Sequence, residues 1–395
     1  MKNSKNLFER STKVFPKGVN SPVRYYPPYP RFIKKGKGSL IWDVDDKAYI
    51  DFLLAYGPLI LGHSPDRVVK RIAETVQNGT VFGAPTELEV KFGEVLTKSA
   101  DLEKVRLVNS GTEATMHSIR LAMHHTGRKK VLKVRGGYHG THPFNFDSDL
   151  VESVEFNSPD SVAEKLSTRE YACFIVEPVM GNIGVIPPAE DFLAGVREIT
   201  ERTGTLLIFD EVITGYRTGF YPYYRKMKLE PDLATFAKII GGGLPLAAFG
   251  GKEDIMGEVR PSGSFSQAGT FSGNPVSVAA GLETLEILST KDYSHLEKLT
   301  DTAVRGLSES GLAVNSQTGM LSIFFTDGSV MRASDVLKSR KDLYFRFFER
   351  ALDNGIFLAP SYDETIFISF EHGEKEVKEA FEFLGEEAKR LWKAA

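Results

Sequence analysis

An aspartate and a lysine stand at the ends of two neighbouring apolar runs. Residues 206–210 (Leu-Leu-Ile-Phe-Asp) have the pattern of a buried strand that ends in Asp210, and Lys238 precedes the three glycines Gly241–Gly243. A fixed carboxylate keeps a pyridine nitrogen protonated, and a desolvated primary amine forms a Schiff base with an aldehyde. The pair therefore predicts a pyridoxal phosphate site, in which Lys238 holds the cofactor and Asp210 tunes its ring.

A candidate phosphate site lies in the segment 109–114 (Asn-Ser-Gly-Thr-Glu-Ala), between a predicted strand and a predicted helix. Backbone N–H groups, hydroxyls and the helix dipole together attract an anion there. Taken alone, the segment favours an ordinary helix N-cap, with Ser110 or Thr112 accepting from the first turn. Beside the Asp/Lys pair, it favours phosphate binding.

Two further segments offer groups to a flat, phosphorylated ligand. Residues 136–140 (Gly-Gly-Tyr-His-Gly) follow a predicted strand, and their glycines let the Tyr138 ring approach a pyridine closely. Thr270 lies in a polar loop before an apolar helix and could donate its hydroxyl to a phosphate. A surface turn and a plain loop with an N-cap are the respective alternatives.

The triple glycine also invites a dinucleotide interpretation, which we reject. That fingerprint opens a helix directly after a strand, and Pro245 blocks such a geometry. Arg24 and Glu364 come from opposite ends of the chain and, by themselves, are surface charges. A lone lysine near glycines is usually solvated as well, so the combination of groups carries the prediction.

The composition is that of an ordinary globular protein. The 395 residues are 42% hydrophobic and 26% charged, with a formal net charge of -3, which excludes fibrous and disordered classes. Short basic clusters without interleaved aromatic residues argue against a nucleic-acid partner. The single cysteine, Cys173, lies in a predicted buried strand and fits a reducing cytoplasm. We see no signal peptide and no apolar run of membrane-spanning length, and we predict no metal site.

Short β-rich runs alternate with longer amphipathic segments from about residue 45 to 285, which predicts an α/β fold with helices on a mostly parallel sheet. We expect a large cofactor-binding domain over 46–288 and a smaller α+β domain over 289–395 with long helices near 332–354 and 373–393. Prolines at 27, 28 and 30 indicate that residues 1–45 form an irregular arm associated with the small domain.

The chain resembles the class III pyridoxal-phosphate aminotransferases of fold type I, and among them the glutamate-1-semialdehyde 2,1-aminomutases. The resemblance runs almost end to end and rests on the order and joint presence of several motifs, namely 18–24 (GVNSPVR), 57–63 (GPLILGH), 82–87 (FGAPTE), 109–114 (NSGTEA), 177–182 (EPVMGN), 210–212 (DEV) and 268–275 (AGTFSGNP).

The resemblance implies a role for each matching residue. Lys238 would form the internal aldimine and Asp210 would pair with the pyridine nitrogen. Ser110, Gly111 and Thr112 would hold the phosphate. The remaining residues would surround the ring and the substrate: Tyr138 stacks on one ring face, Val212 packs on the other, Asn182 lies near the ring hydroxyl, Thr270 reaches the phosphate of the neighbouring subunit of a homodimer, and Arg24, Tyr56 and Glu364 meet the substrate, with Arg24 pairing its carboxylate.

Two departures from the aminomutase pattern bear on the reaction. Only about ten residues, 141–150, precede the next predicted strand, where the aminomutases carry a long glycine-rich lid, and Tyr56 replaces their usual tryptophan. Without a lid the keto product escapes, which is ordinary transamination between a small-molecule amino donor and a keto acid or aldehyde acceptor. We therefore expect an aminotransferase. Glutamate-1-semialdehyde aminomutase, which makes 5-aminolevulinate, is the alternative, followed by an amino-acid racemase and a non-catalytic cofactor-binding protein.

Overall fold

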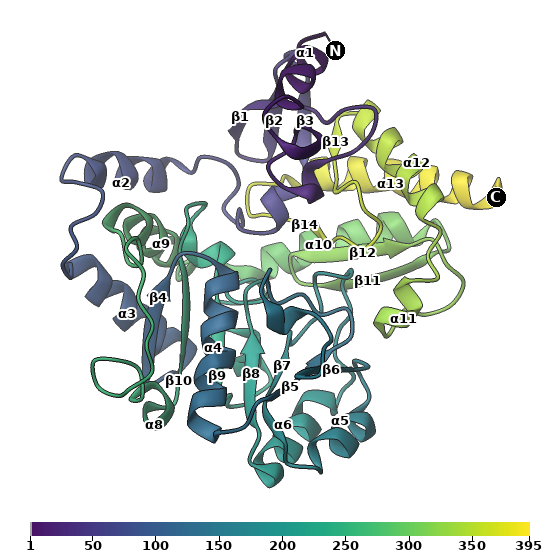
Figure 1. The fold of residues 1–395 in the computed structure, drawn as a ribbon. Coiled ribbons are helices and arrows are strands. Elements are labelled where there is room, and N and C mark those ends of the chain that lie inside the picture. The colour runs from purple at the N-terminus through teal and green to yellow at the C-terminus, as the bar shows by residue number, and fades with distance from the viewer. Residues whose placement is uncertain (1) are drawn as a thin grey trace.

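The computed structural model describes residues 2–395, and its largest sheet has seven strands in the order β4-β10-β9-β8-β7-β5-β6 (Figure 1). The strands from β6 to β9 run parallel to one another, whereas β10 is antiparallel to both of its neighbours. This arrangement confirms the predicted α/β class with a mostly parallel sheet. The strands are β4 (Lys104–Val108), β5 (Lys130–Val134), β6 (Val151–Val154), β7 (Tyr171–Val176), β8 (Leu206–Asp210), β9 (Leu233–Phe236) and β10 (Ala247–Gly251).

Helices cover both faces of this sheet, which is why its central strands are apolar throughout. In β7, Cys173 and Ile175 pack in the cluster that includes helix α4 (Gly111–Thr126), and Phe174 and Val176 pack in the cluster that includes α6 (Phe192–Thr203). Successive side chains of a strand point to opposite faces, so both faces of β7 are buried. The other helices of this region are α2 (Asp66–Val76), α3 (Glu87–Ala100), α5 (Pro159–Leu166), α7 (Tyr223–Lys226), α8 (Glu253–Met256) and α9 (Pro275–Leu288).

Two smaller sheets are built mainly from the ends of the chain. One has the order β1-β2-β3-β13, and the other has the order β11-β12-β14. Strand β13 pairs in parallel with β3, so the first and last parts of the sequence share a sheet. The predicted domain ranges stay a prediction. The strands are β1 (Ile33–Lys37), β2 (Leu40–Asp43), β3 (Ala48–Asp51), β11 (Ala313–Gln317), β12 (Met320–Phe324), β13 (Ile356–Phe357) and β14 (Ile366–Phe367), beside the helices α10 (Tyr293–Ser308) and α13 (Glu374–Lys393).

The structure corrects two expectations. The first 45 residues are not wholly irregular, because α1 (Lys2–Ser11) precedes the prolines and β1 and β2 follow them. The helix expected near 332–354 is divided into α11 (Ala333–Val336) and α12 (Lys341–Asp353). The break occurs where the chain bonds to Phe325 after β12: the Ser339 hydroxyl accepts from its N–H at 2.9 Å, and the Arg340 N–H donates to its carbonyl at 2.8 Å.

Within residues 2–395, no helix combines the length and the apolar character that crossing a membrane requires. The carboxyl ends of β4, β5, β7, β8 and β9 meet at one edge of the large sheet, which is where open α/β sheets place their ligand sites.

Candidate active site

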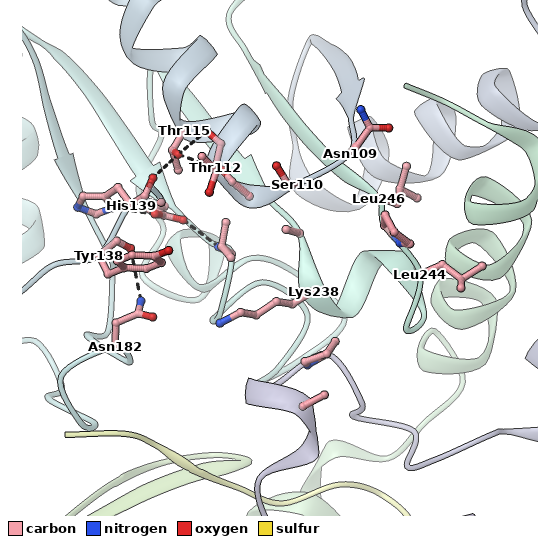
Figure 2. A pocket seen from close by; sticks show the side chains of 18 of the residues that line it. Asn109, Ser110, Thr112, Thr115, Tyr138, His139, Asn182, Lys238, Leu244 and Leu246 are labelled. Carbon is pink, nitrogen blue, oxygen red and sulfur yellow. Dashed lines mark hydrogen bonds and ion pairs between the residues drawn. The ribbon is translucent and has the colours of Figure 1, made fainter. Parts of the chain in front are cut away.

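A cavity of about 310 Å³ opens at this edge and brings together eight of the predicted site residues (Figure 2). They come from segments far apart in the sequence, because each follows the end of a different strand or opens a helix. The Lys238 amine points toward Tyr138 and Asn182. The eight are Ser110, Gly111, Thr112, Tyr138, Asn182, Asp210, Val212 and Lys238.

Asp210 is the last residue of β8 and is held by three hydrogen bonds. Its Oδ1 accepts from the Val212 N–H and the Thr235 hydroxyl, both at 3.1 Å, and its Oδ2 lies 2.7 Å from Nδ1 of His139. Both side chains of the His139–Asp210 pair are buried. These contacts fix the carboxylate at the pocket, where it can meet a ring nitrogen.

His139 was missed by the sequence analysis, which considered the Tyr-His pair after β5 but gave a role only to the tyrosine. The position after a strand was the available signal. It could not show that the imidazole turns inward to a carboxylate 71 positions further along the chain.

Lys238 directly follows β9 and has a backbone φ of 51°, a left-handed conformation that is strained for a lysine. Burial and, next, the positive charge of Arg217 lower the pKa of its amine to about 8, against the opposing pull of Glu177, Glu364 and Asp210. A substantial fraction of the amine is therefore uncharged just above neutral pH, as a nucleophile and proton carrier requires.

The N-terminus of α4 forms the anion cradle. Ser110 is its N-cap, and its hydroxyl accepts from the Glu113 N–H at 3.2 Å, so the ordinary capping role is present. The same hydroxyl keeps a hydrogen to donate, and the N–H groups of Gly111 and Thr112 belong to the first turn, which has no intrahelical acceptors. Gly140 closes the cradle: a Cβ there would lie 2.7 Å from Cα of Thr112.

The residues predicted to meet the cofactor ring line the same cavity as Lys238. The Asn182 amide donates to Oε2 of Glu177 at 2.9 Å and to the Tyr138 carbonyl at 3.5 Å, and the Tyr138 ring is 45% exposed. Val212 lies beneath Gly111, where an added Cβ would come within 3.2 Å of its methyl groups. Burial raises the pKa of Glu177 to about 8, with a further contribution from Asp210. Glu177 is a second residue that the sequence analysis quoted only as part of a motif.

The predicted substrate residues lie beside this pocket. Arg24 and Tyr56 line a neighbouring cavity of about 520 Å³, and Ala55 borders both cavities. Glu364 acts electrostatically on Lys238 and Tyr56, and burial raises the pKa of its carboxyl to about 7.

Thr270 is separate from the other predicted residues. It is exposed and does not line the cofactor cavity of its own chain. The connection from 141 to 150 contains a short 3-10 helix, Pro143–Asn145, and a tight turn that Ser148 and Val151 close before β6.

The pocket fits pyridoxal phosphate in the chemistry of its donor groups. The helix N-terminus suits a phosphate, the fixed carboxylate of Asp210 suits a protonated ring nitrogen, and the partly deprotonated Lys238 suits an aldehyde.

Comparison with known proteins identifies relatives over nearly the whole chain. Residues 22–146 and 150–372 match the family described as Aminotransferase class-III. The chain is 45% identical to the glutamate-1-semialdehyde 2,1-aminomutase of Thermoplasma volcanium, over 95% of this chain and 96% of the relative. It is 42% identical to the enzyme of that name from Methanothermobacter thermautotrophicus, over 96% of this chain and 97% of the relative.

Solved structures share the fold. An omega-transaminase from Sphaerobacter thermophilus superposes with a TM-score of 0.91 at 29% identity, covering 98% of both chains. A glutamate-1-semialdehyde aminomutase from Pseudomonas aeruginosa PAO1 has a TM-score of 0.89 at 24% identity, covering 99% of this chain and 95% of the other, and is similar in fold.

Proposed function

Because the chain belongs to the class III aminotransferase family, whose members are pyridoxal-phosphate enzymes, we propose that it transfers an amino group from a small-molecule donor to a separate keto acid or aldehyde acceptor. The short connection 141–150, which reaches β6 at Val151, carries this proposal. An open pocket lets the keto product leave before it can recapture the amino group, and intermolecular transfer requires that release.

Each pocket residue has a task in this reaction. When bound, pyridoxal phosphate supplies an electron sink that stabilises negative charge on the substrate carbon. Lys238 would be the attachment point for the cofactor, and its amine would then hold and move the proton at the substrate carbon. Asp210, held by His139, would pair with the ring nitrogen, and Ser110 and its neighbours in the first turn of α4 would hold the phosphate.

The substrate would lie between the two cavities. Arg24 offers a guanidinium for a carboxylate, and Tyr56 donates its hydroxyl to the Val23 carbonyl at 2.6 Å, which holds it next to Arg24. Glu364 faces the same region through its effect on Tyr56 and Lys238. The amino group of the substrate would then meet the lysine side of the pocket.

The second candidate is glutamate-1-semialdehyde 2,1-aminomutase, which is favoured by the name of the relatives that are 45% and 42% identical over nearly the whole chain. In that reaction the amino group moves between adjacent carbons of one molecule. No external acceptor is consumed.

The two candidates are separated by product analysis. Purified holoenzyme is mixed with glutamate-1-semialdehyde alone, and separately with an amino donor and pyruvate, and 5-aminolevulinate and alanine are quantified. Alanine without 5-aminolevulinate is the expected result. Substantial 5-aminolevulinate without an acceptor would establish the aminomutase, and inversion of an amino acid without any keto acid would establish a racemase.

The proposed active unit is a homodimer in the cytoplasm. Thr270 is exposed, and the adjacent Phe271 is 62% exposed. The same loop packs on α3, because Gly273 lies against Glu89, whose neighbour Val90 is 59% exposed. Burying these two exposed apolar side chains against a second subunit would be favourable, and pairing there would let Thr270 reach the phosphate of the partner. A monomer that binds cofactor with full affinity would contradict this arrangement.

A further inference from the structure

Arg217 is a fully buried arginine whose charge has no ionic partner. Its Nε donates to the Ile213 carbonyl at 2.8 Å and its Nη2 to the Gly57 carbonyl at 2.5 Å, and the guanidinium lies 4.7 Å from the centre of the Phe367 ring. Among residues 2–395, no carboxylate comes within 4.0 Å of it, and Nη1 is buried without a hydrogen-bond partner. Buried charges are normally paired because desolvation is costly.

Arg197 of α6 illustrates the usual arrangement. It is also buried, and its Nη1 lies 3.0 Å from the carboxylate of Asp232. Burial lowers the pKa of Arg217 to about 9, which leaves its guanidinium protonated at neutral pH. An isolated positive charge is therefore retained inside the protein at this position.

The hydrogen bond from Arg217 to the Gly57 carbonyl holds a strained part of the pocket wall. Leu54, Ala55 and Tyr56 have φ values of 46°, 55° and 66°, and Gly57 has a φ of 109°. Each non-glycine residue in this conformation costs about 1–3 kcal/mol, so the surroundings must hold the turn. The turn places Ala55 between the cofactor cavity and the cavity of Arg24. Arg217 binds its last carbonyl and therefore anchors the wall between the two cavities.

The second effect of Arg217 is on Lys238. The charged groups that act on the lysine amine come from four places: Glu177 after β7, Asp210 at the end of β8, Glu364 before β14, and Arg217. The three carboxyl groups favour the ammonium form, and Arg217 is the group of this set that opposes it.

We propose that Arg217 is a positioning residue of this active site: it anchors the turn 54–57, which forms the wall between the two cavities, and it places a buried, unpaired positive charge within electrostatic reach of the Lys238 amine. This proposal rests on Lys238 being the reactive amine, but not on the identity of either substrate. It explains why the fold tolerates a buried cation without a partner. If Arg217 were paired with a carboxylate, the negative charge would cancel most of the electrostatic effect of its guanidinium on the Lys238 amine.

The test uses the apoprotein, so that it does not depend on turnover. Lysines are labelled with a small amount of acetic anhydride between pH 6 and 11, and the Lys238 peptide is quantified by mass spectrometry against that of Lys375, whose side chain is 86% exposed. In the wild type, the labelling midpoint of Lys238 should lie near pH 8. In Arg217→Met and Arg217→Gln it should rise by about one pH unit.

Two variants serve as controls. Arg217→Lys keeps the charge and should keep the low midpoint, and Arg197→Met removes a paired buried arginine and should leave the midpoint unchanged. An unchanged midpoint in both neutral variants at position 217, or an equal rise in Arg197→Met, overturns the proposal. If the neutral variants do not fold, a wild-type midpoint near 10.4, the ordinary lysine value, would overturn it on its own.

A failure of the proposed function is seen separately. If Lys238→Ala still forms the absorbance band of a lysine-bound cofactor, Lys238 is not the attachment point, whatever the labelling of Arg217 variants gives.

Discussion

Replacing His139 by leucine tests how Asp210 is held. The change removes the 2.7 Å contact to Oδ2 and leaves the two 3.1 Å contacts to Oδ1. Both partners are buried, so the Oδ2 atom of Asp210 that loses its partner cannot regain a hydrogen bond from water. A buried acceptor without a hydrogen bond costs about 1–3 kcal/mol. We expect the free energy of unfolding to fall by about 2 kcal/mol.

The assay is urea denaturation of the apoprotein at pH 7.5, together with titration of the cofactor. An Asp210 carboxylate that is held only through Oδ1 should also weaken cofactor binding by about tenfold or more, which corresponds to at least 1.4 kcal/mol. His139→Asn is the matched rescue, because the amide nitrogen of asparagine falls near the position of Nδ1. It should recover part of both losses.

His124→Leu is the control on α4. Its imidazole is 39% exposed and contacts the Ser264 hydroxyl at 3.1 Å, so the expected loss of stability is below about 0.5 kcal/mol. The reasoning is refuted if His139→Leu unfolds at the same urea concentration as the wild type. It is also refuted if asparagine restores neither stability nor cofactor affinity.

Three further changes should have measurable effects. Lys238→Met should stabilise the apoprotein, because the pKa of the wild-type amine falls from 10.5 in the unfolded chain to about 8 in the folded protein. The buried amine therefore destabilises the fold by roughly 3 kcal/mol below pH 8, and this destabilisation vanishes above pH 10.5. A gain in melting experiments that does not shrink as the pH rises would contradict this. Glu177 has a folded pKa raised to about 8 from 4.5, so the stability it contributes is lost as pH rises from 4.5 to 8. Glu177→Gln should therefore lose less stability than the wild type over that range, by on the order of a few kcal/mol, and parallel pH curves would argue against the assignment. Gly140→Ala would place a Cβ 2.7 Å from Cα of Thr112 at a φ of 100°, so cofactor affinity should fall by about tenfold or more, whereas unchanged binding in a cofactor titration would mean that the cradle lies elsewhere.

The places of the central residues at strand ends and at a helix N-terminus could be predicted from the sequence because they depend on local patterns, whereas the roles assigned to these residues stay predictions. Asp210 ends an apolar run long enough for one strand, and Ser110 stands where a strand gives way to a helix. Local patterns of this kind also predicted the mostly parallel sheet, since hydrophobic periodicity and strand length are properties of short segments.

The tertiary structure alone decided which distant groups meet. His139 turns inward to Asp210 and Glu177 accepts from Asn182, and no pattern in the sequence expresses either contact. The same holds for the division of the helix near 332–354, where Phe325 binds the chain at Ser339. Long-range hydrogen bonds override local helix propensity in such places.

Arg217 shows the limit of the sequence most clearly. The sequence analysis gave this residue no role, but folding places its guanidinium against Gly57, 160 positions away, and buries its Nη1 without a hydrogen-bond partner. The sequence determined that an aspartate, a lysine and a helix N-terminus were available for the chemistry. The burial of those groups, and the charges that surround Lys238, arise from packing between segments far apart in the chain, and together they lower the pKa of the Lys238 amine.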